Sequence, residues 1–426
     1  MVEAATIFAP STPRGRGAVA VLRVSGPEAQ RCAEDLCGGP VPFDRRMRLR
    51  RLSAPTGARL DEALVVGFPP GGSFTGEAVL ELHCHGGPAV VEAVLAALGA
   101  TPGLRPAGPG EFTRRAVENG RMSVVEAEAL ADLVAAETEG QRELALLGLS
   151  GAFTARMVEW RGRLTEALAL LEADIDFADE DIGDGHLETA RAAMTAVRDA
   201  LRAECAAGDG ARSVREGFTV AVIGPPNVGK STLVNALARR EVAITSETPG
   251  TTRDVLEARI VIGGQAVTLL DTAGMREGGD PIERIGVARA AARATDADLR
   301  LFVSDGARSA DLALWREGDL HVRAKADIDP EADLSAISGL GLSALSEMIG
   351  ARAAAAAQRR GLAFRERHLA ALRTAAAALD RALAEGPVEV AGEHLREAVR
   401  SLDTLVGRID AEDVLGEIFA SFCIGK

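Results

Sequence analysis

The sequence is poor in aromatic side chains: tyrosine is absent, and aromatic residues make up 3% of its 426 residues. It has no apolar run near the roughly 18–20 residues of a membrane-spanning helix. Its N-terminus lacks a basic segment followed by an apolar block, so no secretion signal is indicated. The five cysteines are scattered and include no Cys-x-x-Cys pair, so neither a disulfide framework nor a zinc site is indicated. These absences predict a cytoplasmic protein with no membrane partner.

Acidic residues outnumber basic ones, which gives a net charge of −14. This charge argues against broad, non-specific binding of nucleic acid but leaves room for a local basic patch. The length predicts about three domains, each with its own hydrophobic core. Strand-like runs occupy the first ~118 residues, and helical spacing covers about 123–171 and about 187–207. Strands and helices alternate from 218 to about 356, and the tail is helical again at 359–384 and 390–422.

The clearest motif is a glycine-rich loop that reads Gly-Pro-Pro-Asn-Val-Gly-Lys-Ser from Gly224 to Ser231. A buried strand is expected before it at 218–223 and a helix after it. In that setting the motif binds phosphate, because the glycines let backbone N–H groups curl around phosphate oxygens. Lys230 is expected to reach the β- and γ-phosphates, and Ser231 to ligate Mg²⁺. The sequence therefore predicts a nucleoside triphosphate site.

Two further segments follow in the order of a GTPase. A polar loop at 248–254 offers threonines that can close over the γ-phosphate, and we expect Thr252 to complete the Mg²⁺ shell. A buried strand at 266–270 then ends in Asp-Thr-Ala-Gly, where Asp271 would hold Mg²⁺ through water and the Gly274 N–H would reach the γ-phosphate. Segments of this kind are ordered by the γ-phosphate and released on hydrolysis.

The motif that reads the base is imperfect. A strand at 320–323 leads into Ala324-Lys325-Ala326-Asp327, where GTPases usually carry Asn-Lys-x-Asp. Asp327 can still accept from the two guanine N–H donors, which adenine does not offer as a matching pair, and this disfavours an ATPase. Ala324 lacks the amide that contacts guanine and braces the phosphate loop, a contact worth about 0.5–1.5 kcal/mol. We expect weakened nucleotide affinity with guanine preference kept, and a second base-side loop at 335–338.

The group that would activate water is not obvious from the motifs alone. Met275 follows the Asp-Thr-Ala-Gly segment, where Ras-like proteins carry a glutamine that orients water. Glu283, in a predicted helix start, is the nearest candidate carboxylate. From position alone it is equally well explained as an acid favoured by the helix dipole.

The chain resembles the MnmE/TrmE family of tRNA-modification GTPases over essentially its whole length. Besides the motifs above, the resemblance rests on segments outside the nucleotide site that other GTPase families lack. They are Phe74–Glu77 with His83–Gly87, Gly108–Ala116 with Asn119–Arg121, Glu126–Leu130 and the terminal Phe422–Lys426.

The resemblance implies a multidomain fold of the α+β and α/β classes. Residues 1–118 would form an N-terminal α/β domain that binds tetrahydrofolate and dimerises. Residues 119–213 and 357–426 would be two parts of an all-α helical domain that ends in Cys-Ile-Gly-Lys. Residues 214–356 would form an inserted Ras-like P-loop GTPase domain.

The resemblance also implies a one-carbon donor, 5-formyl- or 5,10-methylene-tetrahydrofolate. By similarity, the folate would contact Arg23, Glu81, Arg121 and Lys426. The family often has lysine in place of Arg121, which keeps the charge, and Ala78 stands where an aspartate is common. The helical domain would carry the catalytic candidate Cys423 near the modification site.

In the family the GTPase domains dimerise through their switches, and a potassium ion replaces the arginine finger. Asn227 matches the potassium-binding asparagine, and the remaining loop ligands, which are oxygen donors suited to a hard cation, match Ser246, Thr248 and Thr251. Glu283 matches the family's water-orienting glutamate. The expected GTP contacts are Asn227, Val228, Gly229, Lys230, Ser231, Thr232, Ser246, Thr248, Gly250, Thr251, Thr252, Asp271, Thr272, Ala273, Gly274, Lys325 and Asp327.

The implied function is that of the GTP-hydrolysing subunit, a homodimer, in a complex with a flavin-binding MnmG-type partner and with tRNA as the substrate. The complex would add a carboxymethylaminomethyl-type (aminomethyl) group at carbon 5 of the wobble uridine. The alternative is a GTP-dependent switch in ribosome assembly. That alternative would need an RNA-binding appendix such as a KH unit, and none follows the GTPase segment.

Three smaller features each have a functional and a purely structural interpretation. His83 and His85 could be a metal pair, but without a clear third ligand a structural or substrate-side role is favoured. Without the resemblance, Cys423 would be read as an exposed thiol. The acidic turn at 174–181 is read as a solvated linker in preference to a metal site.

Overall fold

The computed structural model describes residues 5–176, 185–243, 257–271, 295–305, 314–358, 361–363, 365–384, 386–406 and 425. It divides into two compact units, Met1–Ala131 with Asp403–Lys426, and Asp132–Leu402. Within the described stretches, no helix combines the length and the apolar character needed to cross a bilayer.

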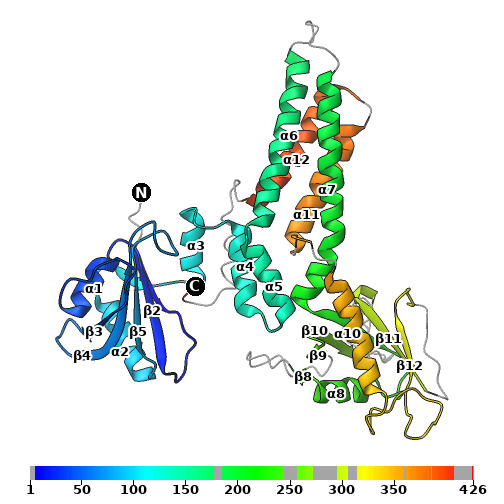
Figure 1. The fold of residues 1–426 in the computed structure, drawn as a ribbon, viewed down its shortest axis with the longest axis horizontal. Coiled ribbons are helices and arrows are strands. Elements are labelled where there is room, and N and C mark those ends of the chain that lie inside the picture. Colours follow the sequence, from blue (N-terminus) through cyan, green and yellow to red (C-terminus); the bar gives the residue numbers. More distant parts are fainter. Residues whose placement is uncertain are drawn as a thin grey trace, which may run out of the picture. The chain divides into compact units, whose positions relative to one another are not determined.

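The first unit is built on a six-stranded sheet in the order β3-β4-β5-β2-β1-β6 (Figure 1). All neighbouring strands are antiparallel except β1 and β6, which run parallel. The strands are β1 (Thr6–Pro10), β2 (Val19–Ser25), β3 (Arg48–Ser53), β4 (Arg59–Phe68), β5 (Val79–His85) and β6 (Leu104–Pro106).

Two helices, α1 (Ala29–Cys37) and α2 (Pro88–Ala100), cover one face of this sheet. The core between them includes Leu22, Leu80 and Leu82, each fully buried. Because successive side chains in a strand point to opposite faces, Arg23 and Glu81 lie on the other face of the sheet. Helices α3 (Glu111–Glu118) and α4 (Val124–Ala135) follow.

The second unit contains a helical bundle. Its helices are α5 (Glu139–Leu149), α6 (Ala152–Asp176), α7 (Gly185–Glu216), α11 (Glu366–Leu383) and α12 (Val388–Val406). Helix α7 packs along both α6 and α11, and Arg396 of α12 pairs with Glu172 of α6 at 2.8 Å. The chain returns to the bundle beside Glu204, a buried carboxylate that accepts from the backbone N–H groups of Leu362 and Ala363.

In the sequence between α7 and α11, the chain forms a second six-stranded sheet, in the order β12-β11-β7-β10-β9-β8. Its elements in chain order are β7 (Phe218–Ile223), α8 (Lys230–Arg240), β8 (Val242–Ala243), β9 (Glu257–Ile262), β10 (Gln265–Asp271), β11 (Leu299–Ser304), β12 (Leu320–Arg323) and α10 (Leu342–Gln358). Strands β10, β7, β11 and β12 are parallel neighbours, while β8 and β9 pair antiparallel. The predicted fold class, with an α/β segment inserted into a helical domain, is confirmed.

The segment from about 123 to 171, predicted to be helical, consists of α4, α5 and most of α6. The second begins at Thr138, whose side chain accepts from the Gln141 N–H while the Gln141 side chain accepts from the Thr138 N–H. This reciprocal cap starts a helix on a new axis. The predicted tail helix from 390 to 422 is helical from Val388 to Val406, and its remainder lies outside the described residues.

A buried ion pair ties β11 to β12. Arg300 and Asp319 have side chains only 4% and 2% exposed, and the Arg300 Nε donates to Asp319 Oδ2 at 2.8 Å. Burial acts to raise the pKa of the Asp319 carboxyl, but hydrogen bonds from the Arg300 side chain and from the N–H groups of Arg316 and Arg300 outweigh it and hold that pKa below its ordinary value. The pair therefore contributes stability above the ordinary carboxyl range and loses it as the pH falls through the depressed folded-state pKa.

We predict that Asp319→Ala destabilises the α/β segment by about 3–5 kcal/mol, because it leaves the Arg300 guanidinium buried without its carboxylate. Urea unfolding in a Trp160→Phe background, where Trp315 is the remaining tryptophan, reports on this segment, since Trp315 packs against Phe302 of β11. The exposed neighbour Glu317→Ala serves as the control and should change the unfolding free energy by less than about 0.5 kcal/mol. Equal midpoints for the two variants would contradict the assignment.

Candidate functional site

The glycine-rich loop joins β7 to α8 as the sequence predicts. A Cβ atom on Gly224 would lie 2.2 Å from the Val303 carbonyl oxygen of β11, so only glycine fits there. Gly229 and Asn227 have left-handed φ angles of 105° and 62°. Gly229 precedes the first residue of α8, so the helix N-terminus and its free N–H groups open onto the loop. This is the geometry of a phosphate cradle.

Lys230 is held inside this loop. Its side chain donates to the carbonyl oxygens of Gly224 at 2.7 Å and Pro225 at 2.9 Å, and the residue is 6% exposed. Burial lowers the pKa of its ammonium group, while the nearby Asp271 carboxylate acts against that shift. Two carbonyl dipoles satisfy the cation, which keeps it extended along the loop where an anion would bind.

Asp271 ends β10, whose parallel pairing with β7 sets Asp271 beside Val222. Because parallel strands present their carboxyl ends at the same edge, the carboxylate and the phosphate loop share one edge of the sheet. Asp271 is 6% exposed. The Asp271 carboxylate and the Ser231 hydroxyl at the start of α8 offer oxygen ligands of the kind that Mg²⁺ prefers.

The residues expected to read the base lie close together. The Ser335 hydroxyl, fully buried, donates to Asp327 Oδ1 at 2.7 Å and accepts from the N–H groups of Ile337 and Ser338. The loop 335–338 thus orients the Asp327 carboxylate. Lys325 has a φ of 75°, and its Nζ pairs with Asp305 Oδ2 at 2.6 Å. Sequence reasoning missed Asp305, although its position directly after the buried strand β11 is a signal for this edge.

Ala324 occupies an apolar position. It is 5% exposed and belongs to the same hydrophobic cluster as the phosphate-loop residue Val228. Its backbone N–H donates to Ser304 O at 2.8 Å. Thr232, one turn into α8, lines a hollow of about 500 Å³ together with residues 336–339. The hollow therefore lies between α8 and the loop that supports Asp327.

Several expected site residues lie outside the described residues. They are Ser246, Thr248, Gly250, Thr251, Thr252, Thr272, Ala273, Gly274, Glu283, Cys423 and Lys426. The chain has three lysines, Lys230, Lys325 and Lys426, and each is one of the expected site residues.

A second constellation lies on the open face of the N-terminal sheet. Arg23 donates from Nε and Nη2 to Glu81 Oε1 at 3.0 and 2.8 Å, and its guanidinium carbon lies 5.9 and 5.7 Å from the ring centres of Phe74 and Phe112. These two rings were not predicted as site residues, although Phe74 belongs to a motif that carries the resemblance. Arg121 lies against the 74–77 segment that carries Phe74. Its Cδ is 3.3 Å from the position that a Cβ on Gly76 would occupy.

The C-terminal motif reaches this unit through Gly425. Its carbonyl oxygen accepts from Ser11 Oγ at 3.3 Å, and a Cβ at this position would lie 2.0 Å from the Pro10 carbonyl oxygen. Gly425 is buried, with a φ of 105°. The contact is next to β1, and β1 in turn pairs Ala9 with Arg23 of β2.

The two histidines of the His-Cys-His segment have separate partners. His83 Nε2 lies 3.4 Å from Glu81 Oε2, and His85 Nδ1 lies 2.8 Å from Asp61 Oδ1. In the part of the chain that the structure describes, no three His, Cys, Asp or Glu residues gather as metal ligands.

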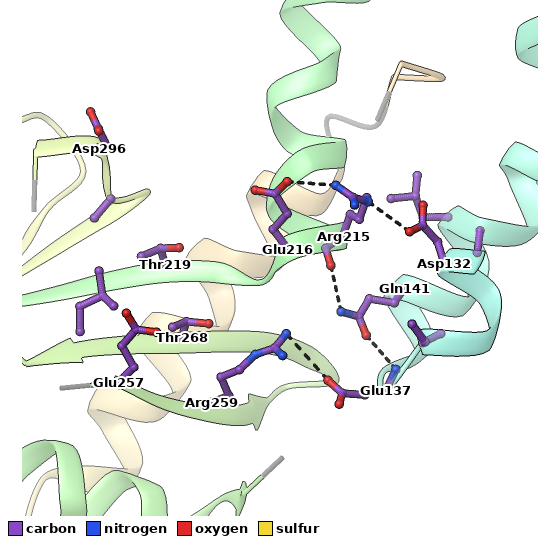
Figure 2. A pocket seen from close by; sticks show the side chains of 16 residues that line it. Asp132, Glu137, Gln141, Arg215, Glu216, Thr219, Glu257, Arg259, Thr268 and Asp296 are labelled. Carbon is purple, nitrogen blue, oxygen red and sulfur yellow. Dashed lines mark hydrogen bonds and ion pairs between the residues drawn. The ribbon is translucent and has the colours of Figure 1, made fainter. Parts of the chain in front are cut away.

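A cavity of about 770 Å³ lies where the helical bundle meets the inserted sheet, and none of its lining residues belongs to the phosphate loop. Figure 2 shows Arg215 at the end of α7 paired with Asp132 and Glu216, while Gln141 of α5 donates to the Arg215 carbonyl oxygen at 3.1 Å. Glu137 faces Arg259 of β9 at 3.8 Å. The cap of α5 therefore contacts the β9–β10 pair, the strands that lie between the two expected switch segments in the sequence.

Comparison with known proteins covers the whole chain. The family model described as the GTP-binding protein TrmE N-terminus matches residues 6–121, and the one described as the MnmE helical domain matches residues 124–423. A protein of Ruegeria pomeroyi named tRNA modification GTPase MnmE is 49% identical, covering 99% of this chain and 100% of its own length. A Methylobacterium protein of the same name is 48% identical, with 99% of each chain covered.

Among solved structures, the G domain of the T. maritima FeoB iron transporter is 25% identical, covering 32% of this chain and 98% of its own, with a TM-score of 0.25. A TM-score this low does not establish a shared fold, and the family assignment does not depend on it. The curated relatives, by contrast, match this chain from one end to the other at almost half of its positions. The chain therefore belongs to the MnmE/TrmE family of tRNA modification GTPases, as its sequence motifs indicate.

Proposed function

We propose that this chain is the GTP-hydrolysing subunit of a complex that adds a carboxymethylaminomethyl-type group at carbon 5 of the wobble uridine of tRNA, using a tetrahydrofolate-borne carbon. One observation carries the proposal. The full-length relationship to tRNA modification GTPases coincides with a glycine-rich loop that holds a buried lysine and with an Asp327 carboxylate that accepts from Ser335.

The described residues divide the work of binding GTP. Lys230 would turn from the carbonyl oxygens of the loop to the β- and γ-phosphates, and the loop N–H groups would hold the phosphate oxygens. Asp327, oriented by Ser335, would accept from the guanine N–H donors. Mg²⁺ held by Ser231, Thr252 and the water shell of Asp271 would neutralise charge on the phosphates.

Hydrolysis would depend on potassium and on a pair of chains. Asn227 has an exposed side chain at the tip of the loop, where it can turn outward to a cation together with Ser246, Thr248 and Thr251. A cation there would stabilise the charge that develops on the transferred phosphoryl group, as an arginine finger does. Glu283 would orient the attacking water, since Met275 cannot.

The N-terminal constellation suits a folate. A reduced pterin presents neighbouring N–H donors, which the Glu81 carboxylate can accept, and a folate tail carries carboxylates that Arg23, Arg121 and Lys426 can pair. The contact of Gly425 with Ser11 supports a C-terminus close to that face. Cys423 would then act near the modification site.

Partners follow from the same proposal: a homodimer, a flavin-binding MnmG-type protein and tRNA. The nucleotide state would reach the bundle through the β9–β10 pair, because Arg259 faces Glu137 beside the cap of α5. A change in the switch segments that moves β9 would thereby shift α5.

The test of the function is mass spectrometry of tRNA nucleosides from a strain that lacks the protein. We expect loss of the carbon-5 aminomethyl-type wobble uridines and their return with the intact gene. Glu81→Gln should not restore them, because removing a charged acceptor weakens folate binding roughly 10- to 100-fold. Glu92→Gln, an exposed carboxylate on α2, should restore them fully. An unchanged tRNA nucleoside profile in the deletion strain would contradict the proposal and favour the ribosome-assembly switch.

We predict that potassium raises the rate of GTP hydrolysis over sodium by roughly tenfold or more, given that an arginine finger is worth 10³–10⁵. Asn227→Ala should abolish this difference while GDP binding persists. The exposed Asn235→Ala on α8 is the matched control and should keep it. The measurement is the initial rate of GTP hydrolysis in potassium and in sodium salt. Equal rates for the unaltered chain would rule out the cation site.

We predict that Ala324→Asn tightens GDP binding about two- to tenfold, because it returns one polar contact to the base and the phosphate loop. Ala324→Leu, similar in size but without an amide, separates this effect from simple filling of the site. Fluorescent GDP titration measures both. An unchanged dissociation constant for the asparagine variant would show that Lys325, Asp305 and Ser335 already fix the loop.

A further inference from the structure

The edge strand of the N-terminal sheet carries a concentration of arginine. Between Arg45 and Arg51, five of seven residues are arginine, whereas the whole chain has 48 lysines and arginines in 426 residues. Arg59, which begins the neighbouring strand β4, adds a sixth. The arginine edge is defined as Arg45, Arg46, Arg48, Arg50, Arg51 and Arg59.

Four of the six residues of the arginine edge are exposed, and Arg48 and Arg50 are half-buried. Strand β3 is the outermost strand of its sheet and pairs only with β4. Arg45 and Arg46 are exposed, and the side chains of Arg51 and Arg59 are 76% and 63% exposed. Within β3, Arg48 and Arg50 share one face and Arg51 lies on the other, while Arg45 and Arg46 precede the strand. The edge is therefore an extended positive row that reaches both faces of the strand rather than a single pocket.

Its positive charge is only partly neutralised. Arg48 is paired with Asp44 by two hydrogen bonds, at 2.7 and 2.6 Å. Glu62 lies between Arg51 and Arg59, at 3.6 and 3.9 Å. Asp61 is engaged by His85. Among the described residues no carboxylate pairs with Arg45 or Arg46, so an excess of positive charge remains at this edge of a chain whose net charge is −14.

Charged side chains on an edge strand also protect it from pairing with other strands. That function is met by one or two charges of either sign, and it does not require six arginines within fifteen residues. Leu49 and Leu64, cross-strand partners on the open face, are 59% and 43% exposed, so the edge is not uniformly polar either. The concentration of one sign is what needs an explanation.

We propose that the arginine edge is a contact surface for the phosphate backbone of RNA, and that it holds the tRNA substrate against the N-terminal unit. This inference rests on the proposed function. An RNA approaching a chain with net charge −14 is repelled over most of the surface, so a local positive row both attracts it and fixes where it lands. Arginine forks bind phosphate oxygens by paired hydrogen bonds, and contacts of this kind position RNA without reading its sequence.

The experiment is a fluorescence anisotropy titration of a labelled tRNA transcript with the full-length chain over a range of salt concentrations. The test variant is Arg45→Gln/Arg46→Gln/Arg51→Gln. The control, Arg142→Gln/Arg163→Gln/Arg373→Gln, removes the same charge from bundle side chains that are 50%, 54% and 50% exposed. The test variant should bind at least about tenfold more weakly near 100 mM salt, and its slope of log Kd against log salt should fall by about 2–3. The control should stay within about twofold.

Two results would overturn the proposal. Equal affinity of the test variant and the unaltered chain removes the edge from RNA binding, and equal loss in both variants shows a general charge effect. If light scattering instead shows that only the test variant changes its oligomeric state, with RNA affinity unchanged, the edge serves a second copy of the chain. GTP hydrolysis without RNA should be the same in all three proteins, so a failure here is distinct from failure of the nucleoside test.

Discussion

The parallel pairing of β7 with β10 on one side and β11 on the other is the constraint on which the nucleotide site depends. It sets the glycine-rich loop, Asp271 and Asp305 at the carboxyl edge of one sheet although they are far apart in sequence. The approach of Gly224 to the Val303 carbonyl oxygen is a direct result of that pairing. A side chain there would push β7 and β11 apart and move every group that follows either strand.

The nucleotide site and the Arg23–Glu81 cluster have one feature in common. In each, protein groups hold a cationic side chain in place before any ligand binds. In the inserted sheet, Lys230 rests on two carbonyl oxygens and Lys325 on Asp305. In the N-terminal sheet, Arg23 lies beside two aromatic rings and binds Glu81. Such partners reduce the rotamer freedom that a ligand would otherwise have to remove. For Lys325 and Arg23 the partner is a carboxylate, which also keeps the side chain from pairing elsewhere on an acidic protein.

Local sequence patterns correctly predicted elements whose structure depends on neighbouring residues, such as buried strands and the glycine-rich loop. The buried run at Phe218–Ile223 is β7, and the glycine-rich loop and the 320–323 strand lie where expected. The sequence predicted helical structure from 123 to 171 but not its division into three helices, because the spacing of Ala and Leu continues through the breaks and only the Thr138–Gln141 cap marks one of them. Contacts between distant residues, such as Lys325 with Asp305 and Arg23 with Phe112, depend on strand order, which periodicity does not reveal. The resemblance named Arg23 and Glu81 as folate contacts but did not name the two aromatic rings.

The scarcity of lysine has a practical meaning for this chain. Nearly all of its basic residues are arginines, whose charge is permanent, and lysine is kept at the phosphate loop, the base loop and the C-terminus. Side-chain primary amines therefore occur only where a nucleotide or a folate is proposed to bind. An amine-acylating reagent acts on this protein as a built-in reporter, with Lys230 shielded in its loop and Lys325 partly open. Because Lys325 is open before a nucleotide binds, its protection from acylation follows the occupancy of the base loop by mass spectrometry on the unaltered chain.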